Sequence, residues 1–424
     1  MTVDAYDEIR RQALDRIDTA GIDPNADPDE LKNLLEETVE DYQRRAQLGQ
    51  GRSLANTRDT LERLYRSVAA LGPLGDLLER DDIEEIFIEG DRVAYLEAGG
   101  WLRGLETPTT EEENRLVVER LVAGTDRRLD RSSPISQARV LDGSARLTAV
   151  IPPVADRLSA TIRRYALRKE TLSSLVDLGS LPKAAATFLA LAMRTSASVI
   201  VSGPPGAGKT SFLSALIAAV PSEHCVRCCE EVREIHVPLV HGSYYEARPP
   251  SLDGGGEISL RDLVKVTLAM RPDLIVVGEV RGAEAFELTR AVNAGCGLAC
   301  TIHANSAADA LHALVNAALM AGVNVPERVV RKVFASSIDL VVHLERDVDP
   351  DHGRIRRETF EIRALVPSLH DDFSTEPLFE RTRVGAPMEW TGAQPPAPLT
   401  RRLERAIPEG SSLSAVMKGE DSLW

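Results

Sequence analysis

Short apolar runs alternate with helical patterns in the second half of the chain. Residues 198–202, Ser-Val-Ile-Val-Ser, are typical of a buried strand, and residues 209–219 have the spacing of a helix. Two more continuous apolar runs lie at residues 271–279 and 298–303, as expected for parallel strands covered on both faces. The pattern predicts a doubly wound α/β domain over about residues 181–345.

The first half has a different pattern. Residues 1–70 contain three stretches of helical spacing, the second beginning at Asp27-Pro28 with a cap and a proline at the first helical position. From residue 71 the pattern changes to short alternating strands, with a hairpin over residues 85–102. Thr110, with Glu113 as capping partner, opens one helix, and two further strands are expected at 145–150 and 159–163. We therefore expect a helical segment over 1–70 and a smaller α+β domain over 71–166.

The remaining segments connect or extend these parts. Residues 167–180 are interpreted as a linker, and residues 346–424 as a proline-punctuated C-terminal extension without catalytic residues. Within the extension, residues 360–366 are predicted to form a final edge strand and residues 399–406 a short helix.

Composition limits the possible partners. The 424 residues carry 50 Lys and Arg against 65 Asp and Glu, a net charge of −15, which argues against general binding to nucleic acid. No apolar run approaches the roughly 18 residues that span a bilayer, and the N-terminus lacks the pattern of a signal peptide. The expected location is cytoplasmic, with any membrane role passing through a partner.

The five cysteines form two groups, Cys225, Cys228 and Cys229, and Cys296 with Cys300. A Cys-x-x-Cys pair with a distant second pair is one arrangement that holds zinc. The alternative is small buried cysteines in a reducing compartment. Adjacent Cys228 and Cys229 on a strand would point to opposite faces, which counts against a shared metal.

Between the strand at 198–202 and the helix at 209–219 lies a perfect match to G-x-x-x-x-G-K-[ST]. Glycines allow a tight turn whose N–H groups point at one anion, and the new helix adds its positive end. Lys209 is expected to reach the β- and γ-phosphates of ATP and the Thr210 hydroxyl to bind Mg²⁺; the alternative is a glycine-rich turn that binds nothing. The residues assigned to the nucleotide are Gly203, Pro204, Pro205, Gly206, Ala207, Gly208, Lys209, Thr210 and Ser211.

Polar side chains follow three of the expected strands, where ligands bind in a doubly wound sheet. Residues 230–234 contain three carboxylates, which would orient or deprotonate water, or else form a solvated turn. Glu279 ends the next strand and is expected beside the metal, polarising a water while Mg²⁺ rests on Thr210, the nucleotide and waters. His303 ends a further strand, at the place of a γ-phosphate sensor, although a lone histidine there is more often structural.

Arginines near the nucleotide domain have two interpretations. Arg163, Arg164 and Arg168 are either solvated or supply the charge that stabilises a transferring phosphoryl group.

Taken together, these motifs resemble the ATPase superfamily of type II and type IV secretion systems, and within it the tight-adherence (Flp) pilus branch, the TadA/CpaF-like ATPases. Residues 230–234 look like the family's acidic box, residues 270–282 its Walker B segment and residues 301–305 its histidine box. Residues 132–134, 142–144 and 149–153 of the smaller domain also resemble this branch.

The resemblance implies a RecA-like ATPase domain and a homo-hexamer that acts on an inner-membrane platform protein during pilus assembly or secretion. It implies that Glu231 or Glu234, with Glu279, activates water and that His303 senses the nucleotide. Arg163, Arg164 or Arg248 would supply the arginine contact. Two positions depart from the family pattern: Glu231 replaces an aspartate, and Cys296 replaces a histidine in a shortened loop.

Two alternatives remain open from the sequence. A conjugative or other nucleic-acid motor would need a basic channel, which the acidic composition does not favour. A regulatory module would bind ATP without hydrolysing it.

Overall fold

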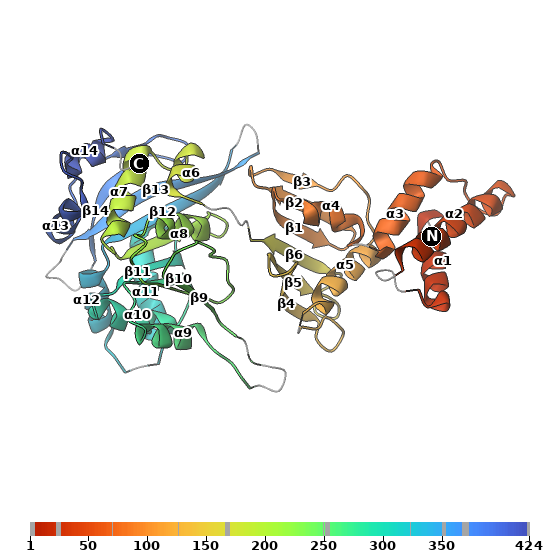
Figure 1. Cartoon of the computed structure of the whole chain (residues 1–424), viewed down its shortest axis with the longest axis horizontal. Coiled ribbons are helices and arrows are strands. Elements are labelled where there is room, and N and C mark those ends of the chain that lie inside the picture. Colours follow the sequence, from red (N-terminus) through yellow and green to blue (C-terminus); the bar gives the residue numbers. More distant parts are fainter. Residues whose placement is uncertain are drawn as a thin grey trace. The chain divides into compact units, whose positions relative to one another are not determined.

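The computed structural model describes residues 5–22, 27–69, 71–125, 127–165, 170–248, 250, 255–322, 324–349, 353–366 and 373–421. These form two compact units, residues 1–167 and 168–424 (Figure 1). We describe each unit by itself.

The N-terminal unit begins with three helices, α1 (Ala5–Ala20), α2 (Pro28–Gln47) and α3 (Thr57–Ala69). They lie where the apolar spacing predicts them, because positions three and four apart face the same core. The buried side chains of this cluster include Ile9, Leu31 and Leu64, each fully buried.

The rest of this unit is a six-stranded antiparallel sheet in the order β3-β2-β1-β6-β5-β4. Helix α5 begins at Thr110 with the predicted capping box to Glu113. Strand β4 was not predicted, because its burial does not follow its hydrophobicity: the polar Ser136 and the small Ala138 are buried while the apolar Ile135 is exposed. The elements are η1 (Gly72–Leu74), α4 (Gly75–Glu79), β1 (Ile83–Glu89), β2 (Arg92–Glu97), β3 (Leu102–Gly104), α5 (Glu111–Ala123), β4 (Ile135–Val140), β5 (Ala145–Val150) and β6 (Ser159–Arg164).

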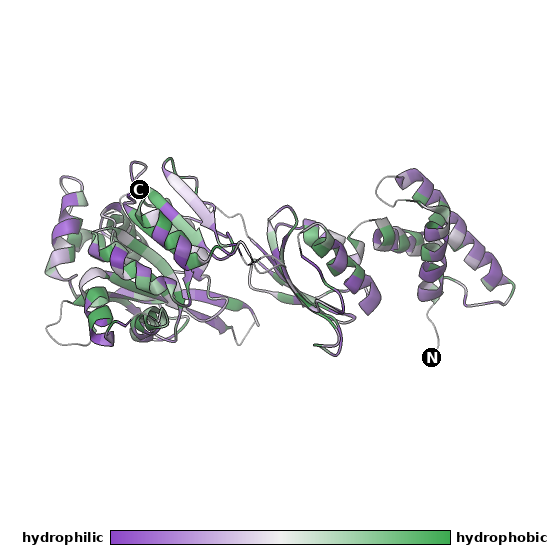
Figure 2. Cartoon of the chain, turned by 90° about the horizontal axis from the view of Figure 1, so that it is seen from below, coloured by the Kyte–Doolittle hydropathy of each residue, from purple (hydrophilic) through white to green (hydrophobic). Residues whose placement is uncertain are grey.

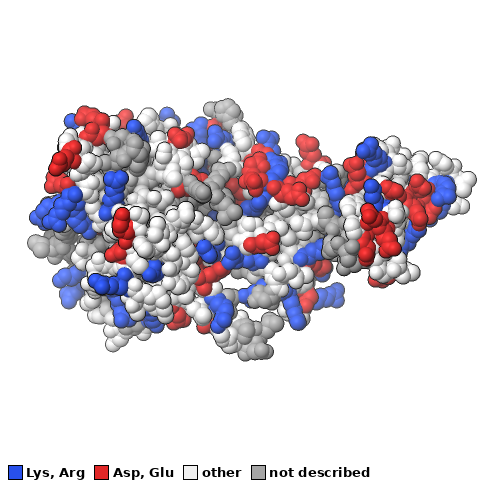
Figure 3. All heavy atoms as spheres, in the orientation of Figure 1, with Lys and Arg blue, Asp and Glu red and all other residues white. Residues whose placement is uncertain are grey.

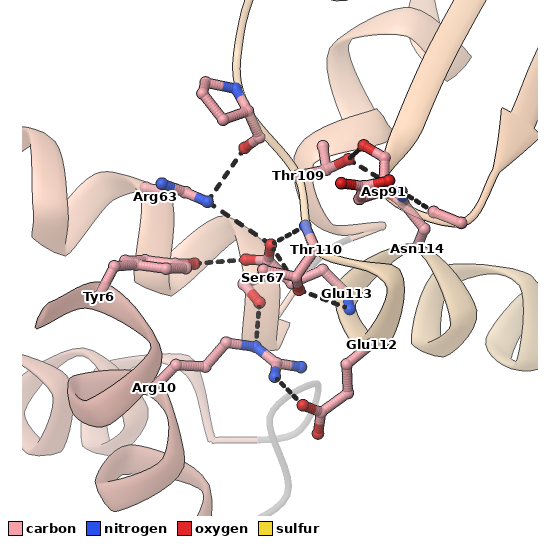
Figure 4. Close-up of polar contacts among 12 residues, drawn as sticks. Tyr6, Arg10, Arg63, Ser67, Asp91, Thr109, Thr110, Glu112, Glu113 and Asn114 are labelled. Atoms are coloured by element: carbon pink, nitrogen blue, oxygen red, sulfur yellow. Dashed lines mark hydrogen bonds and ion pairs between the residues drawn. The ribbon is translucent and has the colours of Figure 1, made fainter. Parts of the chain in front are cut away.

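Polar contacts join the helical segment to α5 (Figure 4). The Tyr6 hydroxyl donates to Glu113 Oε1 at 2.6 Å, and an Arg63 nitrogen lies 3.6 Å from the other oxygen. Arg10 donates to Ser67 at 3.0 Å, which ties α1 to α3. Glu113 is buried, so these donors satisfy a carboxylate that burial would otherwise penalise. The same glutamate thus caps α5 and anchors α1.

The second unit contains a nine-stranded sheet in the order β15-β14-β13-β12-β7-β11-β10-β8-β9. Strands β12 to β9 in this order are parallel, and β13, β14 and β15 extend the sheet in antiparallel fashion. The strands are β7 (Val199–Gly203), β8 (Val226–Glu230), β9 (Gly242–Glu246), β10 (Leu274–Val280), β11 (Gly297–His303), β12 (Leu340–Val348), β13 (Ile355–Val366), β14 (Ser374–Arg381) and β15 (Met388–Trp390).

Helices cover both faces of this sheet, and hydrophobic residues, green in Figure 2, recur along both the strands and the helices. The apolar side chains between the helices and the sheet form its core. The helices of one face share a cluster with Val199 and Val201 and are α6 (Leu172–Asp177), α7 (Lys183–Arg194), α8 (Lys209–Ala218), α13 (Ala397–Ala406) and α14 (Leu413–Lys418). Those of the other face pack around Ile200 and are α9 (Leu260–Leu268), α10 (Glu284–Asn293), α11 (Ala307–Leu319) and α12 (Glu327–Ser337). Cys228 and Cys229 lie in different clusters, as alternation along a strand requires.

Two segments differ from the sequence expectation. Residues 172–177 of the expected linker form α6, because Leu172 and Leu175 belong to the core of the second unit. The expected final edge strand, β13, is internal, since it pairs with β12 on one side and β14 on the other. The helix expected over 399–406 is present as α13.

Acidic and basic side chains are interspersed on the face that Figure 3 shows. Among the described residues, no helix combines the length and the apolar character needed to cross a membrane.

Candidate functional site: the phosphate loop and its neighbours

The phosphate loop is the turn between β7 and α8, as its sequence predicts. Gly206 and Gly208 have φ of 73° and 87°, in the left-handed region that side chains disfavour. Helix α8 begins directly after Gly208, at Lys209. The loop therefore presents backbone N–H groups and a helix N-terminus to one place, which suits an anion.

Gly203 has a second reason to be glycine. Its φ is 152°, and a Cβ there would lie 2.4 Å from the carbonyl oxygen of Leu344 in β12. No side chain fits such an approach, so the start of the loop is pressed against the neighbouring strand.

Lys209 extends back over the loop and is only 8 % exposed. Its Nζ donates to the carbonyl oxygens of Gly203 at 3.0 Å and Pro204 at 2.9 Å. It also lies 3.1 Å from Nδ1 of His303. The ammonium group is thus held beside the loop by neutral acceptors. Charged phosphate oxygens at this position would be stronger hydrogen-bond partners.

His303 connects Lys209 to Glu279. Since Lys209 donates to Nδ1, the ring proton lies on Nε2, which is 2.8 Å from Glu279 Oε1. Burial and the charge of Lys209 lower the pKa of His303, so the ring is neutral at physiological pH. Strands β10 and β11 therefore bring the two predicted residues together beside the loop lysine.

Glu279 is held ionised. Burial opposes its charge, but a hydrogen bond from Arg281 at 2.6 Å and the charges of Arg281 and Lys209 lower its pKa. Its Oε1 is buried and receives no well-directed hydrogen bond from the described residues, despite the short contact with His303. This oxygen keeps an acceptor position for another donor, such as a water molecule.

Within residues 230–234 the buried acid is Glu230, whereas the candidates for activating water are Glu231 and Glu234. Glu230 is 3 % exposed at the end of β8 and accepts the backbone N–H groups of Glu234 and Ile235. Burial, only partly opposed by these bonds, raises its pKa to about 7. Gly278 makes room for it, because a Cβ there would lie 2.7 Å from Glu230 Cγ.

Glu231 is exposed and Glu234 is half-buried. Both carboxylates act electrostatically on Arg281, whose pKa is raised first by the hydrogen bond to Glu279. They thus lie on the side of the site where Arg281 holds Glu279. The role that the resemblance assigns to them stays a prediction.

The arginines predicted to contact the nucleotide have local partners. Arg163 lies 3.6 Å from Glu85, and Arg164 donates to carbonyl oxygens that precede β1, both within the N-terminal unit. Arg248 follows β9 and donates to the Gly256 carbonyl at 2.6 Å. Arg168 lies outside the described residues. Their contribution to phosphate chemistry also stays a prediction.

The residues at the loop fit a magnesium-bound triphosphate. The glycines leave a cradle that side chains would fill, Lys209 supplies a positive charge, and Thr210 stands in the first turn of α8. Among the described residues, no three His, Cys, Asp or Glu side chains form a metal cluster. Mg²⁺ requires few protein ligands when phosphates and waters complete its shell, so Thr210, with Glu279 as the other candidate, would be enough to hold it.

Comparison with known proteins identifies the family. The model of the type II/IV secretion system protein family matches residues 97–376. The chain belongs to this family. Its fold class is as predicted, a RecA-like P-loop domain preceded by a smaller α+β domain and a helical segment.

Several curated members of the type II/IV secretion family are similar over most of their length. A putative conjugal transfer protein of Mycobacterium tuberculosis is 31% identical over 71% of this chain and 86% of its own. Conjugal transfer protein TrbB of Rhizobium radiobacter is 30% identical, over 68% and 88%. Type IV secretion system protein PtlH of Bordetella pertussis is 30% identical, over 63% and 87%.

Solved structures with lower sequence identity are also similar to this family member. The VirB11 ATPase from the Brucella suis type IV secretion system, in complex with sulphate, is 22% identical with a TM-score of 0.35, covering 67% of this chain and 91% of that one. The pilus retraction motor PilT with bound ADP is 18% identical with a TM-score of 0.45, covering 79% and 86%. Membership of the secretion family supports ATPase activity.

Proposed function

We propose that this chain is a magnesium-dependent ATPase that works as a homo-hexameric motor in pilus assembly or protein secretion. The observation that carries the proposal is the connected set Lys209, His303, Glu279 and Arg281 at an intact phosphate loop. A loop that only bound phosphate would not need an ionised carboxylate with an unfilled acceptor position beside its lysine.

The first step is binding. Lys209 exchanges its carbonyl partners on Gly203 and Pro204 for phosphate oxygens, a change favoured because hydrogen bonds between charged groups are stronger. The Thr210 hydroxyl would hold Mg²⁺, which when bound neutralises charge on the phosphates. Release of Lys209 from His303 leaves the imidazole free to respond to the terminal phosphate.

The second step is attack by water in line with the terminal phosphoryl group. Glu279 orients that water through the buried Oε1 and accepts its proton. Arg281 keeps the carboxylate charged and fixes its second oxygen at 2.6 Å. His303 contacts both Oε1 of Glu279 and Nζ of Lys209. A movement of Lys209 when nucleotide binds would therefore change the position of the Glu279 carboxylate.

The biological assignment follows the sequence resemblance. We assign the chain to the tight-adherence (Flp) branch, as a motor acting on an inner-membrane platform protein from the cytoplasmic face. Residues 132–134, 142–144 and 149–153 support that branch. The sequences of curated relatives named as conjugal transfer and type IV secretion proteins support the wider secretion role.

The second candidate function is a motor for DNA transfer. It is favoured by two relatives that are named as conjugal transfer proteins, and opposed by the net charge of −15. Phosphate release measured with and without single- and double-stranded DNA separates the two. Strong stimulation by DNA would replace the pilus assignment.

The test of the ATPase is phosphate release by the purified chain with Mg-ATP. Lys209→Ala should abolish both binding and turnover, because the loop loses its only buried cation within the described chain. Glu279→Gln should still bind ATP but hydrolyse it roughly 100-fold more slowly, since it loses the group that receives the proton.

Lys332→Ala is the matched control, because it removes an exposed lysine from α12. It should retain full turnover. Unchanged turnover in Lys209→Ala would refute the assignment of the site. Phosphate release that is absent in the wild type, with ATP still bound, would favour a regulatory module instead.

A further inference from the structure

The hairpin formed by β12 and β13 runs beside the phosphate loop. β12 is parallel to β7 up to the pair His343 and Ser202. The next residue, Leu344, touches Gly203 through its carbonyl oxygen. Because β7 ends there and β12 continues to Val348, the end of β12 lies alongside the loop itself.

Two arginines of this hairpin face the loop. Arg346 and Arg357 are directly opposite each other in the antiparallel pair, so their side chains share one face. Arg357 Nε donates to the Gly206 carbonyl at 2.9 Å. A Cβ built on Gly206 would lie 3.5 Å from Nε of Arg346, and one on Gly208 would lie 3.7 Å from Cδ of Arg357.

Arg346 has a like charge directly opposite it, which by itself destabilises a strand pair. Arg346 is exposed and makes no hydrogen bond or ion pair within the described part of the chain. The guanidinium groups of Arg346 and Arg357 both adjoin a loop whose geometry suits phosphate, and a guanidinium matches phosphate oxygens in shape and charge.

We propose that Arg346 and Arg357 bind the nucleotide on the side of the loop opposite to Glu279 and His303, at the phosphates nearer the ribose. The proposal rests on the proposed function, since it assumes that a nucleotide occupies the loop. In the sheet, β7 separates β12 from β11. The terminal phosphate belongs beside Glu279 at the end of β10, so groups on the β12 side contact the α- and β-phosphates.

A specific consequence follows for affinity. ATP and ADP share the α- and β-phosphates, so loss of an arginine should weaken both nucleotides by the same factor. For one charge-assisted hydrogen bond we expect a loss of about tenfold. Arg346 is the more informative position, because its removal breaks no contact within the described chain that could loosen the loop.

The experiment is calorimetric titration of the full chain with Mg-ADP and with a non-hydrolysable ATP analogue. Arg346→Ala should weaken both ligands about tenfold, while its melting temperature without nucleotide stays that of the wild type. Arg346→Lys should recover part of the loss, because it keeps the charge. Arg357→Ala should weaken binding further than Arg346→Ala, since it also frees the Gly206 carbonyl.

Arg356→Ala is the matched control, because Arg356 lies on the opposite face of β13 and pairs with Asp349. Its affinities should stay within about twofold of the wild type. Unchanged affinity in Arg346→Ala, an equal loss in Arg356→Ala, or a loss for the ATP analogue alone would each overturn the assignment. If the wild type binds neither ligand, or Lys209→Ala binds as the wild type does, the proposed function itself fails.

Discussion

Glu230 makes the stability of the second unit depend on pH. It is 3 % exposed, and burial raises its pKa from 4.5 to about 7. In the unfolded chain the carboxyl ionises at its ordinary pKa, so between pH 4.5 and 7 the folded state holds the proton more tightly. The contribution of Glu230 to stability is therefore fully present below pH 4.5 and is lost as the pH rises through 7.

The magnitude follows from the shift in pKa. A difference of roughly 2.5 pH units corresponds to about 3 kcal/mol in the free energy of unfolding. The lower half of the pH range over which the Glu230 carboxyl acts lies close to the isoelectric point of 5.2, where proteins tend to precipitate, so measurements are practical from about pH 6 to 8.5. Between these two pH values the destabilisation caused by the buried carboxyl should grow by roughly 1 to 1.5 kcal/mol.

The perturbation is Glu230→Gln. Glutamine has the same shape and keeps an oxygen that accepts the N–H groups of Glu234 and Ile235, but it cannot ionise. The difference in melting temperature between the variant and the wild type should therefore shift in favour of the variant by about 3 to 5 °C from pH 6 to 8.5.

Differential scanning calorimetry measures this difference, with the transition of the second unit identified as the one that Mg-ADP raises. Glu231→Gln is the matched control, because it removes an equal charge from the exposed neighbour. Its difference from the wild type should stay constant with pH. A constant difference for Glu230→Gln as well would refute the reasoning that burial keeps this carboxyl protonated.

Two further substitutions test packing at the loop and in the N-terminal unit. Gly203→Ala places a Cβ 2.4 Å from a carbonyl oxygen of β12, so it should lower the free energy of unfolding by about 2 kcal/mol or more and weaken ADP binding. Gly104→Ala is the control, because Gly104 has open space around it, and it should change the melting temperature little. Tyr6→Phe removes the donor to the buried Glu113 and should lower the stability of the N-terminal unit by about 1 to 3 kcal/mol in thermal unfolding. An unchanged transition would show that Glu113 finds another partner.

The sequence predicted those features that depend on local pattern. The loop, its flanking strand and helix, and the strand ends that carry Glu279 and His303 follow from short apolar runs and a fixed motif. Such runs specify a parallel strand because both of its faces are buried. The meeting of Glu279, His303 and Lys209 then follows from the common edge at which parallel strands end.

The features that the sequence did not predict depend on pairing between distant segments. Glu230, and not Glu231, is buried because β8 lies beside β10 where Gly278 leaves space. Arg346 and Arg357 reach the loop only because β12 pairs with β7 and β13 pairs with β12. No local pattern predicts these pairings. Strand β14 mixes polar and buried positions, so its membership of the sheet is set by its neighbours and not by its own pattern.

The placement of the last strands limits how the chain can be dissected. The match to the family model ends at residue 376, yet Phe379, Leu403 and Met417 are fully buried in the same cluster as Val199 of the loop strand. Phe379 also packs against Phe188 of α7, with ring centroids 5.9 Å apart. Truncation after residue 376 would remove apolar side chains that cover the sheet carrying the phosphate loop. The described residues after 376 are thus an integral part of the unit that carries the phosphate loop and not a removable module.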